Sequence, residues 1–256
     1  MLFDSIVYGP IHSRRLGISL GINLMPTTHK LCTFDCVYCE CGFNTPVSHP
    51  QLPSREEVAK ALELALQNET TTPDVITFSG NGEPTLHPDF EGIITDTCAL
   101  RNRYCPKAKV SVLTNSTQLM REDILRALRL CDNRILKLDS AIDSTMRLID
   151  RPVNQQLTVQ QLINRLAQFD GDFTLQTCFL RGEVPDGEGT TTIDNTSDEE
   201  LAAWYKAVDI LRPKQIMIYV IDRATPVKTL EKISRDKMEA IAAPLRQKGF
   251  DVSISA

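Results

Sequence analysis

One short stretch sets the interpretation of the chain: Leu31-Cys32-Thr33-Phe34-Asp35-Cys36-Val37-Tyr38-Cys39. Its thiols follow a C-x3-C-x2-C pattern, which is too tightly spaced for a stiff element and suits a loop that wraps a metal cluster. Thiolates at such spacing select iron–sulfur clusters or zinc. A [4Fe–4S] cube has more irons than this run has cysteines, so one iron would stay open for a ligand that is not protein.

Composition places the chain among ordinary globular proteins. Its 256 residues are 42% hydrophobic and fit a single domain, 1–256, of barrel size. The net charge of −5 does not favour a nucleic-acid partner. We see no signal peptide and no apolar run of the roughly 20 residues that span a bilayer. We therefore expect a cytoplasmic protein without a membrane partner, whose 8 cysteines serve metal binding or catalysis rather than disulfides.

Strand-like and helix-like segments alternate along the chain, a pattern that is typical of βαβ units and a parallel sheet. Strand character is found at 16–25, 74–79, 109–115, 134–140, 172–180, 215–221 and 250–255. Helices are expected after capping boxes at 54–57 and 197–200, and at 88–103, 121–130 and 143–169, the last interrupted near Pro152. A final helix from about Ser234 contains Pro244, which should kink or split it. This order predicts an α/β fold, a partial (β/α)6 barrel with its chemistry at the carboxyl ends of the strands. Segment 181–196 is expected to be a long loop on that face.

A glycine-rich turn follows the second predicted strand, at Ser79-Gly80-Asn81-Gly82-Glu83-Pro84. Two glycines and a proline end a strand and leave backbone N–H and C=O groups open to a ligand. Taken alone, such a segment is equally typical of a tight turn.

Three motifs together resemble the radical S-adenosylmethionine (SAM) superfamily. They are the cysteine run with Tyr38 before its last cysteine, the core Gly82-Glu83-Pro84, and Gly9-Pro10-Ile11-His12-Ser13-Arg14-Arg15-Leu16-Gly17. The stretch Gly9–Gly17 and the turn Ser79-Gly80-Asn81-Gly82-Glu83-Pro84 also resemble the branch that includes the wyosine-type tRNA synthases. Asn81 departs from the family pattern by standing between the two glycines. The resemblance implies a partial barrel of the radical SAM type, a [4Fe–4S] cluster on Cys32, Cys36 and Cys39, and S-adenosylmethionine held partly by the 80–84 backbone.

The resemblance also implies a mechanism. A reductant such as flavodoxin or ferredoxin supplies an electron to the cluster, which cleaves the sulfonium C–S bond. The 5′-deoxyadenosyl radical then abstracts hydrogen from a small-molecule, peptide or protein substrate. This reaction requires a potential near the low end of the iron–sulfur range, which spans about −700 to +450 mV.

Period-two alternation indicates which strand residues face the cavity. Lys137 and Asp139 alternate with leucines, and Gln176 and Cys178 alternate with apolar residues that should pack on helices. By resemblance, the residues expected to bind the cofactor are Tyr38, Gly80, Asn81, Gly82, Glu83, Pro84, Asn115, Asp139 and Ser140. The residues expected near the substrate are Arg14, Arg15, Lys137, Gln176 and Arg223. Each of the charged residues has a plainer alternative: a solvated pair for Arg14 and Arg15, a buried salt bridge for Lys137, and a surface ion pair for Arg223.

The remaining cysteines leave alternatives open. Cys178 could return a hydrogen atom to the substrate, or it could simply fill space. Cys41 could act as a fourth ligand, which would make the chain an electron-transfer protein. Cys98, Cys105 and Cys131 are expected to be inert small hydrophobes. Two further functions remain, tRNA base modification and activation of a glycyl-radical enzyme.

Overall fold

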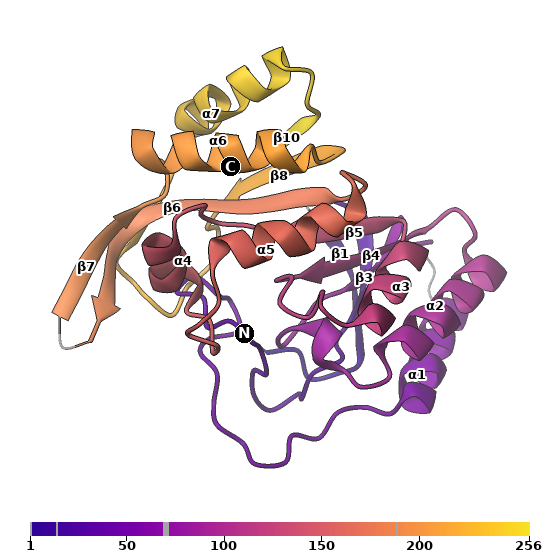
Figure 1. The fold of residues 1–256 in the computed structure, drawn as a ribbon. Helices are drawn as coiled ribbons and strands as arrows, with labels where there is room; N and C mark the ends of the chain where they lie inside the picture. Colours follow the sequence, from indigo (N-terminus) through magenta and orange to yellow (C-terminus); the bar gives the residue numbers. More distant parts are fainter. Residues whose placement is uncertain (1, 14, 69–71, 188) are drawn as a thin grey trace. The chain divides into compact units, whose positions relative to one another are not determined.

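The structure, a computed structural model, describes residues 2–13, 15–68, 72–187 and 189–256 (Figure 1). It contains two compact units, which we take in turn. The first unit consists of Met1–Cys32 and Asn44–Ile135, and the second unit of Thr33–Phe43 and Leu136–Ala256. The cysteine run is shared between them, with Cys32 in the first unit and Cys36 and Cys39 in the second.

The first unit contains a mostly parallel sheet with helices. Its elements are β1 (Val7–Ser13), β2 (Gly17–Ile22), α1 (Arg55–Asn68), β3 (Val75–Phe78), the 3-10 turn η1 (Pro84–Leu86), α2 (Phe90–Tyr104), β4 (Lys109–Thr114) and α3 (Glu122–Leu130). Strands β2, β3 and β4 pair in parallel, and Figure 1 shows α2 lying between α1 and α3. All four residues of β3 are buried, as expected for a parallel strand covered on both faces. The capping box at Ser54 is confirmed by two reciprocal hydrogen bonds. Glu57 N donates to Ser54 Oγ, and Ser54 N donates to Glu57 Oε2.

Strand β1 was not predicted from the sequence. It pairs antiparallel with β2, with an irregular register between Tyr8 and Ile11. The Tyr8 ring covers Gly21, where an added Cβ would lie 2.1 Å from the ring, and Phe3 stacks on the same ring. Gly9 and Pro10 hid this strand, because both residues normally interrupt strand patterns.

The chain passes from the first unit into the second along β5 (Asn133–Lys137). The second unit contains α4 (Asp143–Asp150), α5 (Val159–Leu166), the 3-10 turn η2 (Ala167–Phe169), β6 (Thr174–Asp186), β7 (Gly189–Asp194), α6 (Asp198–Leu211), β8 (Gln215–Val220), β9 (Leu230–Lys232), α7 (Arg235–Gln247) and β10 (Val252–Ser255). Strands β6, β8 and β10 pair in parallel, in that order. The interruption near Pro152 is confirmed, since it separates α4 from α5.

Two expectations for the second unit were wrong. Segment 181–196 is not a loop, because β6 continues to Asp186 and pairs antiparallel with β7. The threonines at 190–192 favour this pairing, whereas the glycines around them favoured a loop. Helix α7 is not split, since it continues through Pro244 to Gln247. Its buried Ile241 and Leu245 hold the last turn in place on either side of the proline.

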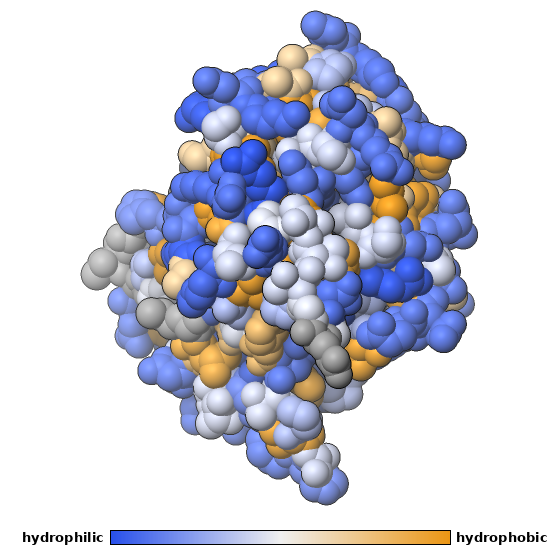
Figure 2. Space-filling view, turned by 90° about the vertical axis from the view of Figure 1, so that its left-hand side faces the viewer, coloured by the Kyte–Doolittle hydropathy of each residue, from blue (hydrophilic) through white to orange (hydrophobic). Residues whose placement is uncertain are grey.

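No helix in the described ranges is long and apolar enough to cross a membrane. The face shown in Figure 2 is largely hydrophilic, with apolar residues scattered between polar ones.

Candidate functional site

The glycine-rich turn of the first unit holds the residue that precedes the first cysteine. Leu31 N donates to Asn81 O (2.9 Å), and Glu83 N donates to Leu31 O (3.1 Å). These two bonds form an isolated parallel β-bridge between Leu31 and Gly82. Gly82 has φ +154°, and an added Cβ there would stand 1.7 Å from Leu31 O. Glycine is therefore required at 82 because the cysteine loop passes so close to the turn.

Asn81, the residue that departs from the family pattern, is fully buried and bonded to its own chain. Its Nδ2 donates to Phe3 O and Pro26 O, both at 2.8 Å, and its Oδ1 accepts from Phe3 N at 2.8 Å. Its backbone N donates to Asn23 Oδ1 (3.0 Å). The Asn81 side chain thus braces the turn and the approach to the cysteine loop.

Glu83 is a buried carboxylate that ties the turn to the tip of β4. Its Oε1 accepts from Thr85 Oγ1 (2.5 Å) and Thr114 Oγ1 (2.7 Å), and its Oε2 accepts from Asn115 N (2.7 Å). Burial raises the pKa of the Glu83 carboxyl, and the hydrogen bonds from Asn115, Thr85 and Thr114 oppose that rise. Pro84 opens η1 directly after it.

Cys32 lies beside two asparagine side chains. Asn115 Nδ2 donates to Cys32 Sγ (3.5 Å), and Asn115 Oδ1 accepts from Thr117 Oγ1 (2.8 Å), which orients the amide. Asn44 accepts from Cys32 N (3.1 Å) and donates to Cys32 O (3.2 Å). Asn115 was predicted from its place at a strand tip. Asn44 was missed, because a lone asparagine after the cysteine run carries no signal of its own.

In the second unit, the rest of the cysteine loop is attached to the end of α4. Val37 N donates to Ile149 O (2.9 Å), and Asp35 N donates to Asp150 O (2.9 Å). A turn then follows, in which Cys39 N donates to Cys36 O (3.1 Å). Backbone bonds therefore fix this part of the loop without using the cysteine side chains.

Lys137 carries a buried ammonium surrounded by acceptors. Its Nζ lies 2.8 Å from Cys36 Sγ, 2.6 Å from Asp150 Oδ1 and 3.2 Å from Asp139 Oδ2. Burial lowers the pKa of Lys137, but the charges of Asp139 and Asp150 outweigh burial and raise it well above its usual value. Burial raises the pKa of the Asp150 carboxyl, and the charge of Lys137 and its hydrogen bond to Asp150 oppose that rise. The salt-bridge alternative for Lys137 is the arrangement found here.

Asp139 also binds Tyr38, the aromatic residue of the cysteine run. Tyr38 Oη donates to Asp139 Oδ2, and the backbone N of Cys178 donates to Asp139 Oδ1 (2.9 Å). Burial, followed by the charge of Asp139, raises the pKa of the Tyr38 hydroxyl well above its usual value. The Tyr38 ring packs edge-on against Tyr219 of β8. The predicted cofactor residues Tyr38 and Asp139 are thus bonded to each other.

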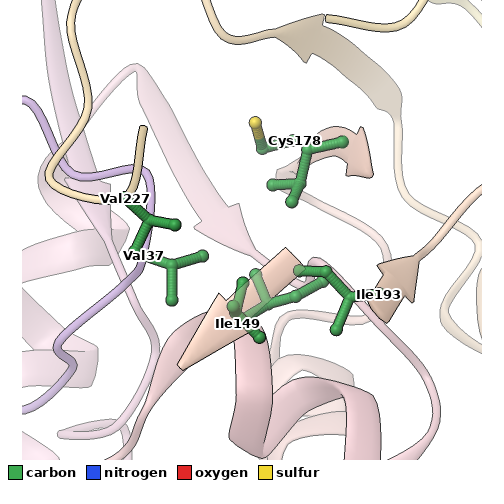
Figure 3. Close-up of a cluster of buried hydrophobic side chains, with 7 residues drawn as sticks. Val37, Ile149, Cys178, Ile193 and Val227 are labelled. Carbon is green, nitrogen blue, oxygen red and sulfur yellow. The ribbon is translucent and has the colours of Figure 1, made fainter. Parts of the chain in front are cut away.

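Cys178 is fully buried in an aliphatic cluster that includes Val37 of the cysteine loop (Figure 3). The members of this cluster are Val37, Ile149, Cys178, Leu180, Val184, Ile193 and Val227. Its neighbour Phe179 packs edge-on against Trp204 of α6, as the expected alternation of β6 requires. The direction of the Cys178 side chain is therefore as predicted, and its surroundings are those of a packing residue. Its role as a hydrogen donor stays a prediction.

The other predicted residues have partners of their own. Ser140 Oγ donates to Glu200 Oε2 (2.7 Å), so Glu200 does not complete the capping box expected at Ser197. Gln176 Nε2 lies 3.7 Å from Met217 Sδ. Arg223 forms an exposed ion pair with Glu40 of the cysteine loop (2.7 Å).

Two predicted residues belong to the motif at the start of the chain. Arg15 lies between β1 and β2 in the first unit, and its backbone N donates to Ser13 Oγ (3.3 Å). Arg14 lies outside the described residues.

The remaining cysteines of the first unit have the character of packing residues. Burial raises the pKa of the thiols of Cys98, Cys105 and Cys131. A raised pKa lowers the thiolate fraction and with it the reactivity. This agrees with the expectation that these three are inert.

The residues present fit a thiolate-bound iron–sulfur cluster. Cys32 Sγ accepts an amide N–H, and Cys36 Sγ accepts an ammonium N–H. Such donors stabilise the thiolate, which is the form that binds metal. The described residues contain no group of three or more His, Cys, Asp or Glu placed to hold a single metal ion. The case for a cluster therefore rests on the cysteine spacing and on the donors beside two of the sulfurs.

Comparison with known proteins points to one superfamily. The sequence profile described as "Radical SAM superfamily" matches residues 27–186. A Brachyspira hyodysenteriae protein named GTPase Obg is 31% identical over 239 residues, which are 91% of this chain and 32% of that protein. The chain thus spans about a third of that relative.

Solved structures share the fold. A radical SAM methyltransferase from Sphaerobacter thermophilus is similar with a TM-score of 0.65 at 15% identity, over 92% of this chain and 65% of that one. A structure of TYW1 with a lysine–pyruvate adduct bound gives a TM-score of 0.65 at 13% identity. The match covers 90% of this chain and 73% of that one. The α/β partial barrel expected from the sequence is confirmed.

Proposed function

The chain belongs to the radical SAM superfamily, and from this we propose that it is an enzyme that cleaves S-adenosylmethionine reductively and abstracts hydrogen from a substrate. The substrate is a small molecule, a peptide or a protein. The observation that carries the proposal is the pair of N–H donors beside Cys32 Sγ and Cys36 Sγ, within a run of three cysteines. Neither donor is needed for a purely structural thiol.

Cys32, Cys36 and Cys39 would hold the [4Fe–4S] cluster. When bound, such a cluster supplies the electron that breaks the sulfonium C–S bond of S-adenosylmethionine. The chain's own residues prepare the ligands: the 80–84 turn fixes Leu31 ahead of Cys32, and the end of α4 fixes Val37 between Cys36 and Cys39. Cys36 and Asp139 are buried and the Lys137 side chain is 11% exposed, which limits the access of water to Cys36. An enclosed site with little water protects a radical from quenching.

The proposal includes an external one-electron reductant, such as flavodoxin or ferredoxin, and a cytoplasmic location. The support for that location is the number of cysteines, which suits a reducing compartment. GTP hydrolysis is not proposed, because the sequence contains no G-x-x-x-x-G-K-[ST] loop to hold a nucleotide phosphate.

Anaerobic reconstitution with iron and sulfide tests the proposal. We expect a brown protein with about four irons per chain that, with dithionite, converts S-adenosylmethionine into methionine and 5′-deoxyadenosine. A fully loaded protein that leaves S-adenosylmethionine intact would contradict the assignment. Retention of tRNA at physiological salt, tighter than the non-specific range of roughly 10⁻⁴–10⁻⁶ M, would instead identify the substrate as tRNA.

A further inference from the structure

The positive charge of Lys137 has no part yet in the proposed chemistry. Its ammonium has three N–H donors, and the structure provides three acceptors: Asp150 Oδ1 at 2.6 Å, Cys36 Sγ at 2.8 Å and Asp139 Oδ2 at 3.2 Å. Two of these acceptors are carboxylates and the third is the sulfur of a cluster ligand. Every N–H of the ammonium is therefore directed at a negatively charged or polarisable atom.

The ammonium is held at the sulfur. The Lys137 side chain is 11% exposed, and its partners Asp139 and Asp150 are 0% and 2% exposed. Asp139 is fixed in turn by Tyr38 Oη and by Cys178 N. Movement of Lys137 into solvent would leave two carboxylates buried without a counter-ion, which is strongly unfavourable. The rings of Tyr38 and Phe34 also face the ammonium, at 4.9 and 5.2 Å.

We infer that Lys137 is a positioning residue that places a fixed positive charge on the Cys36 sulfur and thereby raises the reduction potential of the cluster. The inference rests on the proposed function, because it requires a cluster on Cys36. One-electron reduction of the cluster by an external reductant adds one negative charge. A cation in hydrogen-bond contact with a ligand sulfur stabilises the reduced form more than the oxidised form, and hydrogen bonds to sulfur act in the same direction. Asp150 acts in the opposite direction.

Potentiometric titration of the reconstituted protein, followed by the EPR signal of the reduced cluster, measures this effect directly. We expect Lys137→Met to shift the midpoint potential to a more negative value at unchanged iron content. Asp150→Asn is expected to shift it to a more positive value, because the lysine charge is then less compensated. Lys137→Arg keeps the positive charge, so its midpoint potential should lie closer to that of the unmodified protein than the potential of Lys137→Met does.

The opposite signs separate a charge effect from a loss of structure, since a disturbed loop would shift both variants in the same direction. Lys214→Met is the matched control, because Lys214 pairs with Asp172 on the surface of the same unit (2.9 Å) and should leave the potential unchanged. Equal potentials in the unmodified protein and Lys137→Met, or shifts of the same sign in Lys137→Met and Asp150→Asn, would overturn the inference. Where Lys137→Met binds no cluster, a positive shift in Asp150→Asn supports the inference and an unshifted potential overturns it. Failure of the unmodified protein to bind a cluster would instead refute the proposed function.

Discussion

The two units support their cysteines in different ways. In the first unit, Cys32 lies among neutral groups: the amides of Asn115 and Asn44 and the backbone of the glycine-rich turn. In the second unit, Cys36 lies against a buried lysine with two carboxylates. Neutral hydrogen bonds fix position at modest electrostatic cost, whereas buried charges act on a neighbouring sulfur through a low-dielectric medium. The first unit thus surrounds its cysteine with neutral donors, whereas the second places charged groups beside its cysteine.

The largest effect is expected from the cysteines themselves. Replacing Cys32, Cys36 or Cys39 by Ala should abolish both the brown chromophore and cleavage of S-adenosylmethionine, because each supplies one thiolate of the cluster. Iron analysis and product analysis measure the two losses. Cys41→Ala is the control and should retain both. A full cluster in Cys36→Ala, or its loss in Cys41→Ala, would refute the three-ligand assignment and favour the electron-transfer alternative.

Gly82→Ala tests whether the first unit depends on close backbone approach. An added Cβ would lie 1.7 Å from Leu31 O, so the variant must move the cysteine loop or the turn. We expect the free energy of unfolding of the apoprotein to fall by about 3 kcal/mol or more. Gly249→Ala is the matched control, with φ +87° and no atom within 4 Å, and should cost about 1–2 kcal/mol. Urea unfolding measures both, and equal losses would remove the special role of Gly82.

A matched pair of buried asparagines compares the neutral bracing of the two units. Asn81 in the first unit makes three side-chain bonds to the backbone. Asn195 in the second unit does the same, to Asp139 O, Cys178 O and Leu180 N, each at 2.8 Å. Each replacement by Ala should cost about 3 kcal/mol, at roughly 1 kcal/mol per bond. Urea unfolding measures both losses of stability. A small loss for only one of the two variants would mean that the units differ in their neutral hydrogen bonding as well as in their charged groups.

The pH dependence of stability tests Glu83, the buried carboxylate of the first unit. Burial raises the pKa of Glu83 in the folded protein, so the folded state binds a proton more tightly than the unfolded state. The associated stability is present below the unfolded pKa of about 4.3 and is lost as pH rises through the higher folded pKa. In Glu83→Gln this loss should disappear. Urea unfolding of both proteins across this pH range measures the difference. Parallel curves of unfolding free energy against pH would contradict the raised pKa of Glu83.

The smallest effect is expected at the surface of the second unit. Arg223 and Glu40 form an ion pair with 66% and 46% of their side chains exposed. Arg223→Ala should therefore change the free energy of unfolding by less than about 1 kcal/mol, and the change should vanish at high salt. A large loss of substrate conversion with unchanged stability would instead favour a substrate contact at Arg223.

Much of the fold was predictable because local patterns encode it. Alternation in β6 placed Phe179 toward α6 and Cys178 away from it, and the structure has both. Strand β1 and the β6–β7 hairpin were missed because Gly9, Pro10 and the glycines near 187 normally mark loops. The placement of 1–256 in one domain stays a prediction.

The sequence by itself determined the superfamily and predicted the ligand set, because cysteine spacing, turn glycines and strand periodicity are properties of neighbouring residues. It also placed Lys137 and Asp139 on one face of a strand, which period two requires. Only the tertiary structure decided what surrounds them. Asp150 and Cys36 reach Lys137 from positions 13 and 101 residues away in the chain, a pairing that no local pattern specifies because it arises from the packing of separate elements.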